Sequence, residues 1–457
     1  MLVINPRFGH SHVRFRGKIA DILAAAGHEV VVYQPIFEGK INETGSKHPN
    51  IRYVFANHVM DETIMDDQDQ IWEDDSALKM IRLSNAIAKS QKNHCSILLN
   101  DKQVLKNLKN ENFDLGLGEI FDGCSFGIFE MIGLKKYVAL HSGCMAPIYQ
   151  SYLGIPKTFP FAPAKFSAYT DQMNFFERLG NFFAIQFENW SFKKIYTDGP
   201  EEAIKEVVAE FDMQKKIQEA AFLFVNSDEH VDFTMPITPK LIYTGGLGKS
   251  HSKPLAQKYI DIFNSAKKGV IYFSFGSVVK SKNMPKAMRG AILSAFSEFP
   301  DINFIWKYED DTHQVAKDHS NVFTFRWLPQ NEILEHPKTL AFISHGGMNS
   351  VIEGATKGVP MICIPFYADQ NHNAMILERR GTAETILKNQ VTKQTLVRTI
   401  RKIINVKKYN ENAKLLSKMV KSKVMESEER IVKYSEFAAE FGDSGTLQTE
   451  VNIRKKM

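Results

Sequence analysis

The chain has 457 residues, too many for one compact core, so its length indicates two or three domains. Hydrophobic residues make up 44% and charged residues 24%, which is ordinary for a globular protein with full cores in both halves. The net charge of +5 is too small to predict nucleic-acid binding, and the basic cluster from Arg398 to Lys423 is typical of a solvated helix face.

The first thirty residues predict a strand, a helix and a second, parallel strand. The strands are expected over Leu2 to Ile4 and Val30 to Tyr33, with a helix over Val13 to Ala26 that Gly27 ends. A chain that opens on a core strand has no signal peptide, and no apolar run reaches the ~18 residues needed to span a bilayer. We therefore expect a soluble protein, or a processed or truncated form.

Strand and helix patterns continue to alternate along the first half. Strands are expected over Phe113 to Leu117 and Tyr137 to Leu140, with a helix over Phe126 to Ile132 between them. The stretch from Ser151 to Phe192 is rich in Pro, Phe and Tyr and breaks this rhythm. It predicts either the lining of an apolar site or an aromatic core.

Four cysteines, two glycosylation sequons and one linker complete the general picture. The cysteines form no CxxC pair, so neither a zinc site nor a disulfide scaffold is predicted, and either redox compartment fits. Sequons at Asn42 and Asn189 permit a secretory location without showing one. A Gly-, Ser- and Lys-rich segment over 246–256 predicts a linker, after which the alternation restarts.

The second half continues the same pattern. Its expected strands are Val270 to Phe275, Ile302 to Tyr308, Leu340 to Ser344 and Met361 to Pro365. Its expected helices are Pro285 to Phe299, Asn349 to Lys357 and the Lys-rich stretch from Thr392 to about Phe441. We predict an α/β protein with a domain over 1–245, the linker, a second domain over 257–425, and a C-terminal helix and polar tail over 426–457.

A glycine pair between a strand and a helix predicts a phosphate site. In Ile343 to Ser350, His345 and the two glycines precede a helix whose N-terminal N–H groups favour an anion. Asn349 or Ser350 could instead be only a helix cap. Ligands of such sheets bind beyond the carboxyl ends of the strands.

Further polar residues also follow predicted strands. They are Ser277, Asp369 and Gln370. Trp327 follows Phe323-Thr324-Phe325, where it could stack on a base or belong to the core.

These residues carry a family resemblance. The segments 326–331, 336–337, 342–350, 358–360 and 365–371 closely resemble the signature of the UDP-glycosyltransferase superfamily, especially its animal UDP-glucuronosyltransferase branch. Weaker matches at 27–30, 171–173 and 275–277 extend the resemblance over nearly the whole chain. It implies a GT-B fold, in which two Rossmann-like, doubly wound domains face a central cleft.

The resemblance implies how the second domain binds a UDP-sugar. Trp327 stacks on uracil, Gln330 lies near the nucleoside, Glu353 accepts hydrogen bonds from the ribose, and Asp369 and Gln370 bind hydroxyls of the donor sugar.

The resemblance also implies a set of residues that hold the diphosphate. They are Ser277, His345, Gly347, Asn349 and Ser350.

A catalytic base is needed to take the acceptor's proton, and histidine is the usual base near neutral pH. His10 and His12 both lie in the first strand-to-helix loop. The resemblance places the base fifteen residues before Gly27, which selects His12. The position of its carboxylate partner, an Asp in the resembled family, is occupied by Glu119, one methylene longer, with Asp122 as a fallback.

The predicted reaction is transfer of a glucuronosyl or glucosyl group to a hydroxyl of a small lipophilic acceptor, by direct displacement with inversion. The UDP-sugar is a co-substrate, and no cofactor or metal is expected. Asp67-Gln68-Asp69 forms a DxD pattern, but it lies in an acidic polar stretch and is interpreted as solvated loop. By resemblance only, membrane association at the endoplasmic reticulum is expected, although this chain shows no signal peptide or membrane helix.

Two rival functions stay open. Gly123 to Gly127 matches the GxSxG motif of serine hydrolases, with Ser125 as nucleophile. A non-catalytic UDP-sugar-binding protein is the other, because the donor site looks complete and Glu119 departs from the family pattern.

Overall fold

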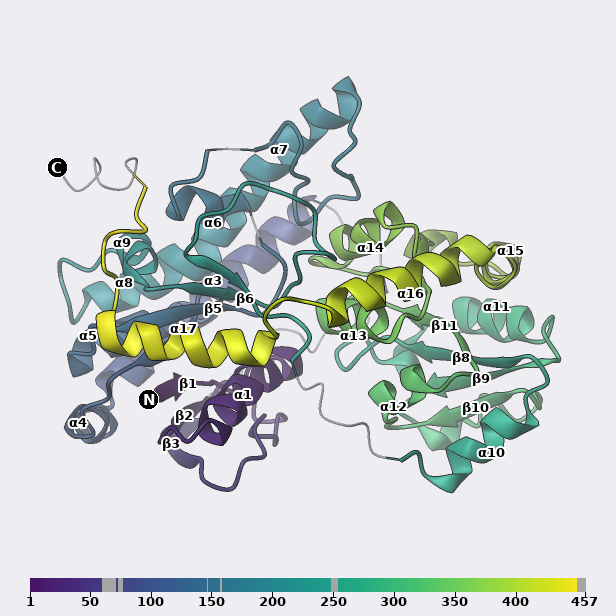
Figure 1. Ribbon diagram of the computed structural model, residues 1–457, viewed down its shortest axis with the longest axis horizontal. Coiled ribbons are helices and arrows are strands. Elements are labelled where there is room, and N and C mark those ends of the chain that lie inside the picture. Colours follow the sequence, from purple (N-terminus) through teal and green to yellow (C-terminus); the bar gives the residue numbers. More distant parts are fainter. Residues whose placement is uncertain (60–70, 73–76, 146, 157, 248–253, 450–457) are drawn as a thin grey trace.

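The computed structural model describes residues 1–59, 71–72, 77–145, 147–156, 158–247 and 254–449. The described strands form two separate parallel sheets, one in each half of the chain (Figure 1). The DxD pattern at 67–69 and most of the predicted linker lie outside the described residues.

The first sheet contains seven described strands in the order β3-β2-β1-β4-β5-β6-β7. They are β1 (Leu2–Ile4), β2 (Val31–Ile36), β3 (Arg52–Val59), β4 (Gly116–Glu119), β5 (Tyr137–His141), β6 (Leu223–Val225) and β7 (Leu241–Tyr243). In the middle of the sheet, Leu2 pairs with Val31 on one side and Gly116 on the other. From β1 the chain adds β2 and β3 on one side of the sheet, and then β4 to β7 on the other side. The boundary between β1 and β4 is therefore the topological switch point.

The helices of the first half surround this sheet. They are α1 (His10–Ala25), α3 (Ala77–Asn100), α4 (Lys102–Asn110), α5 (Cys124–Ile132), α6 (Pro147–Tyr152), α7 (Phe175–Phe192), α8 (Gly199–Lys205) and α9 (Met213–Glu219). Residues of β1 have no exposed surface at all. A parallel sheet covered on both faces needs such uniformly apolar strands, which is why these short runs read clearly from the sequence.

A disulfide joins Cys95 of α3 to Cys124 at the start of α5. No disulfide scaffold was expected, and this expectation was wrong for these two cysteines. The remaining cysteines, Cys144 and Cys363, are free and buried.

The second sheet contains six described strands in the order β10-β9-β8-β11-β12-β13. They are β8 (Gly269–Ser274), β9 (Ile302–Lys307), β10 (Val322–Phe325), β11 (Thr339–Ser344), β12 (Met361–Cys363) and β13 (Ala383–Thr385). Its helices are α10 (Gln257–Ser265), α11 (Lys286–Phe296), α12 (Gln330–Glu335), α13 (Met348–Lys357), α14 (Gln370–Arg379), α15 (Lys393–Asn405) and α16 (Lys407–Lys421). The switch point of this sheet lies between β8 and β11.

The end of the chain returns to the first half. Helix α16 packs on α13, whereas the last helix, α17 (Ser427–Phe441), packs against α1 and β5 of the first sheet (Figure 1). The Lys423 ammonium pairs with Asp228 at 2.5 Å, and Ser427 Oγ donates to the carbonyl of Gly245 at 2.7 Å. The C-terminal segment therefore links the two domains.

The expected strands agree with the observed ones to within a few residues, but several strands and helices were missed. Strands β3, β6, β7, β10 and β13 carry no expectation, and the aromatic stretch from Ser151 contains the last two residues of α6 and all of α7. Helix α1 begins at His10, three residues earlier than expected, so His10 and His12 lie in the helix and not in the loop before it. Within the described part of the chain, no helix is both long and apolar enough to cross a bilayer.

Candidate active site

His12 and Glu119 meet at the switch point of the first sheet. His12 lies in the first turn of α1, directly after β1, and Glu119 is the last residue of β4. His12 Nδ1 lies 3.0 Å from Oε1 and 3.1 Å from Oε2 of Glu119. The longer glutamate side chain therefore reaches the histidine.

Two further residues hold this pair. The Arg16 guanidinium is 1% exposed and lies 3.3 Å from Glu119 Oε2, and it also donates to the carbonyl of Pro6 at 3.0 Å. The backbone N–H of Ser142 donates to Glu119 Oε1 at 2.9 Å, and its hydroxyl lies 2.6 Å from His12 Nδ1. Every contact of the Glu119 carboxylate is thus a donor, which suits an ionised group.

The electrostatics of Glu119 agree with this geometry. Burial raises the pKa of a carboxyl group, but the charges of His12 and Arg16 and the hydrogen bonds from His12 and Ser142 outweigh it. They hold the pKa of Glu119 well below its usual range. Because a carboxylate only accepts hydrogen bonds, Nδ1 of His12 is the nitrogen that donates to Glu119, and in the neutral ring Nε2 is then the nitrogen with a lone pair.

The other candidates in this region have different partners. His10 Nδ1 lies 2.6 Å from Glu43, away from the His12 pair. Asp122, the fallback partner of His12, accepts instead from Ser125 Oγ at 3.1 Å. Burial raises the pKa of Asp122 to about 6. Ser125 itself is 0% exposed, so the hydrolase motif offers no accessible nucleophile.

In the second domain, His345 follows β11, and its ring lies against the backbone of Gly276 and of Gly347. A Cβ on Gly276 would be 2.7 Å from His345 Cε1, and a Cβ on Gly347 would be 2.5 Å from His345 Nε2. Burial, offset in part by Asp369, lowers the pKa of His345 to about 4. The ring is therefore neutral at pH 7 and offers one N–H rather than a positive charge, and its Nδ1 has no partner among the described residues.

The helix after this loop presents a free N-terminus. Gly347 is the N-cap of α13 and makes no side-chain cap, so the structure does not support the alternative that Asn349 or Ser350 is only a helix cap. Both residues lie in the first turn of α13. Ser277 follows β8 and is half-buried beside the same switch point. This part of the sheet has the N–H groups and positive helix end that bind phosphates.

We predict that replacing Gly347 with alanine damages this loop specifically. Alanine can adopt the Gly347 φ of −63°, so no backbone strain is expected. The expected effect comes from the steric clash between the new methyl group and the His345 ring. UDP affinity should fall by at least about tenfold, and stability by about 1–3 kcal/mol. Gly290→Ala in α11 is the matched control, since nothing lies within 4 Å of its Cβ position. Equal UDP dissociation constants for the two variants by calorimetry would contradict this role.

The predicted nucleoside residues lie before and on two neighbouring helices: Trp327 precedes α12, Gln330 begins it, and Glu353 lies on α13. Trp327 is 58% exposed, with the Arg14 guanidinium 5.0 Å and the Lys307 ammonium 5.7 Å from its ring centre. Gln330 Nε2 donates to Glu353, and Tyr272 donates to Gln330 Oε1 at 3.1 Å. An exposed indole beside a paired amide and carboxylate can stack on a base and bind ribose hydroxyls.

The predicted donor-sugar residues open α14, next to the first domain. Gln370 Oε1 accepts from the backbone N–H of Phe366 at 2.8 Å, which leaves its NH₂ group for a ligand. A Cβ on Gly143, in the loop after β5, would be 3.5 Å from Asp369 Oδ2 and 3.0 Å from Lys165 Nζ. The second domain therefore places Asp369 directly against the loop that follows Ser142.

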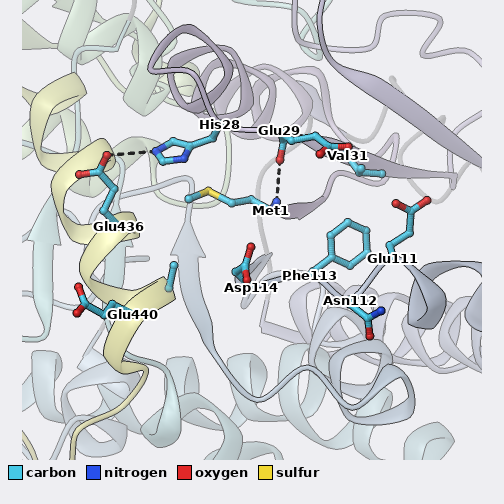
Figure 2. A pocket seen from close by; sticks show the side chains of 11 residues that line it. Met1, His28, Glu29, Val31, Glu111, Asn112, Phe113, Asp114, Glu436 and Glu440 are labelled. Carbon is cyan, nitrogen blue, oxygen red and sulfur yellow. Dashed lines mark hydrogen bonds and ion pairs between the residues drawn. The ribbon is translucent and has the colours of Figure 1, made fainter.

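One pocket of about 390 Å³ lies elsewhere, at the opposite edge of the first sheet (Figure 2). It is lined by Met1, by His28 and Glu29 before β2, by Asp114 before β4, and by Glu436 of α17. These are the amino ends of the strands, whereas ligands of such sheets bind at the carboxyl ends. We therefore do not assign the pocket to the reaction. Among the residues that the structure describes, no cluster of metal-ligating side chains is present.

Arg16 and Ser142, which contact the His12–Glu119 pair, were not predicted from the sequence, and neither was Asn226, which donates to the carbonyl of Ser142 and to Asn349 Oδ1. Arg16 is one helical turn after His12 and so lies on the same face of α1, which was the only available signal. Ser142 and Asn226 follow strands β5 and β6, but serine and asparagine are common in such loops and carried no signal of their own.

One family of known proteins, and several of its members, match the chain over nearly its full length. Residues 1–442 match the family described as UDP-glucoronosyl and UDP-glucosyl transferase. UDP-glucuronosyltransferase 3A1 of Bos taurus is 30% identical, over 96% of this chain and 84% of that protein. UDP-glucuronosyltransferase 1A1 of Homo sapiens is 29% identical, over 91% and 78%.

Solved structures show the same fold. Os79 from O. sativa in complex with UDP is similar with a TM-score of 0.66 at 15% identity, covering 97% of this chain and 100% of that one. Phytolacca americana UGT2, complexed with UDP-2fluoro-glucose and pterostilbene, gives 0.65 at 17% identity, covering 96% and 99%. The predicted GT-B fold with two Rossmann-like domains is thereby confirmed.

The whole-chain match also decides between the predicted functions. It supports an enzyme that transfers a hexosyl group from a UDP-sugar, and it supports neither the serine hydrolase nor the non-catalytic binder. The chain belongs to the family of UDP-glucuronosyl and UDP-glucosyl transferases, within its animal UDP-glucuronosyltransferase branch.

Proposed function

We propose that His12 is the base of the reaction and that the donor's diphosphate binds between α13 and His345. The observation that carries this proposal is the His12–Glu119 pair, at 3.0 Å, at the carboxyl edge of the first sheet. Arg14, two residues after His12, lies 5.0 Å from the ring of Trp327 in the second domain, so the two edges face each other.

In the proposed reaction, Nε2 of His12 takes the proton from an acceptor hydroxyl. The acceptor oxygen attacks the anomeric carbon from the face opposite the diphosphate and forms the new C–O bond. The bond from the anomeric carbon to the diphosphate oxygen breaks, and its electron pair leaves with UDP. Glu119 stays ionised and stabilises the imidazolium that forms.

The departing diphosphate is stabilised by donors already in place. The N-terminal N–H groups of α13, the His345 ring and the side chains of Ser277, Asn349 and Ser350 supply them. Such preorganised donors act on the negative charge as it develops. We propose that they do so without a metal ion or a cofactor.

The donor sugar is proposed to be glucuronic acid or glucose, bound by Asp369 and Gln370, and the acceptor a small lipophilic molecule. The names of the related UDP-glucuronosyltransferases favour the first sugar. Support for an apolar acceptor comes from the aromatic rings around His12. The ring of Phe121 lies 4.3 Å from His12, and Phe8 lies 5.4 Å from Phe121.

A thermal-shift panel of UDP, UDP-glucose and UDP-glucuronic acid tests the donor site. A ligand at 100 times its dissociation constant should stabilise the chain by ~2.7 kcal/mol. UDP is expected to stabilise it, and the sugar that adds further affinity identifies the donor. No stabilisation by any of the three would contradict the proposal.

Trp327→Ala is expected to weaken UDP binding strongly. Stacking of an aromatic side chain on a base contributes about 1–3 kcal/mol, a factor of about 5 to 150 in dissociation constant. Trp190→Ala is the matched control, because that tryptophan is also exposed (41%) but lies on α7 of the first domain. An equal effect of both substitutions in calorimetry would remove Trp327 from the site.

A further inference from the structure

Asn226 joins the two halves of the active site through one amide group. It follows β6 at the carboxyl edge of the first sheet and is 4% exposed. Its Nδ2 donates to the carbonyl of Ser142 at 2.9 Å and to Oδ1 of Asn349 at 2.8 Å. Ser142 borders the catalytic histidine, and Asn349 lies in the first turn of the proposed phosphate-binding helix.

The orientation of this amide is fixed by its partners. An amide NH₂ has two hydrogens, and here each has its own acceptor, one in each domain. The Ser142 carbonyl only accepts, so a rotated Asn226 would bring two oxygen acceptors together. The Ser142 carbonyl is in turn held in place, since the N–H and hydroxyl of Ser142 contact Glu119 and His12.

The hydrogen bond from Asn226 Nδ2 also fixes the orientation of the Asn349 amide. Its Oδ1 accepts from Asn226, so its NH₂ group is directed away from Asn226 and has no hydrogen bond among the described residues. A diphosphate only accepts hydrogen bonds, so Asn349 is useful to it only in this orientation. The amide of Asn349 could otherwise turn by half a rotation and present an oxygen to the phosphate.

We infer that Asn226 is a positioning residue that sets the amide of Asn349 with its NH₂ toward the donor diphosphate, while holding the Ser142 carbonyl beside the base. This inference rests on the proposed function. Asn226 itself touches neither substrate. The Asn226 amide therefore fixes the position of the phosphate-binding helix relative to the loop beside His12.

The inference predicts an unusual order of effects on UDP affinity. In Asn226→Asp, a carboxylate of the same shape faces Asn349 and attracts its NH₂ group, so the oxygen of Asn349 turns toward the phosphate. In Asn226→Ala, Asn349 loses its partner but stays free to turn. UDP binding should therefore be weakened about tenfold more by the isosteric aspartate than by alanine. A merely structural asparagine would tolerate the isosteric change better.

The new charge of the aspartate could weaken UDP binding by itself, so the experiment is repeated with Asn349→Ala. Isothermal titration calorimetry with UDP is expected to show that the difference between Asp and Ala at position 226 largely disappears in this background. A difference that persists unchanged reports charge repulsion alone and overturns the inference. If Asn226→Asp does not fold, the cycle of Asn226→Ala with Asn349→Ala decides: additive losses overturn the inference, and non-additive losses support it.

Asn321→Ala is the matched control for loss of a buried asparagine. Its amide donates to three backbone carbonyls inside the second domain, those of Phe296, Phe299 and Ile302. It should lower stability and leave UDP affinity unchanged. Wild-type protein that binds no UDP overturns the proposed function and this inference with it. Wild-type protein that binds UDP, with the aspartate variant no weaker than the alanine variant, overturns the inference alone.

Discussion

His12→Ala is expected to lower kcat/KM for sugar transfer by about 10²–10⁴-fold, the range typical of removing a general base. The UDP dissociation constant should not change, because His12 belongs to the first domain and the proposed nucleotide contacts belong to the second. The loss should appear in kcat at saturating donor and acceptor. Steady-state kinetics with calorimetry on the same preparation checks both halves of the prediction.

His10→Ala is the matched control for this experiment. The two histidines lie in the same turn of α1, but His10 contacts Glu43, and its side chain is 37% exposed. Its substitution should leave turnover nearly at the wild-type level. A large loss in His10→Ala together with normal turnover in His12→Ala would reverse the assignment of the base.

Glu119→Ala is expected to cost the most stability of any substitution at the site. It removes the only carboxylate that the described residues place within ion-pair distance of the buried Arg16 guanidinium, although Asp122 still acts on it from farther away. Breaking a buried ion pair in this way costs about 3–5 kcal/mol. It also removes the group that orients His12, so transfer should fall with stability. Chemical denaturation measures the first effect and steady-state kinetics the second.

The double substitution Glu119→Gln with Arg16→Met separates these two effects. Removing both members of the ion pair should recover most of the stability lost in Glu119→Gln alone, since the buried guanidinium is no longer there. Transfer should stay low, because the neutral amide cannot stabilise the imidazolium. Recovery of transfer along with stability would mean that Glu119 serves only the fold.

The core strands could be predicted from the sequence because they are buried on both faces of their sheets. Such strands are continuous apolar runs, and β1, β9 and β11 were predicted to within one residue at each end. Strands β6 and β7 are only three residues long each, which is too short for periodicity to separate them from loops. Residues 52–56 of strand β3 are exposed or half-buried, so this part of the strand lacked a clear pattern.

The site was only partly predictable, for a different physical reason. His12 and His345 follow strands and could be found by position and resemblance. Arg16 could not be predicted, because a charged residue on a helix is normally solvated. Its burial depends on the neighbouring Glu119 carboxylate, which the sequence alone does not place beside it. The Cys95–Cys124 disulfide likewise depends on how α3 and α5 pack, which spacing in the sequence does not reveal.

The stereochemistry of the product tests the central claim most directly. If His12 activates an acceptor hydroxyl for a single displacement, sugar from an α-linked UDP donor should appear in β-linkage in the product. Proton NMR of the product formed on a simple phenolic acceptor measures the anomeric coupling. A β-linked product that disappears in His12→Ala is the predicted result. An α-linked product, or a β-linked product formed equally well without His12, would contradict the account.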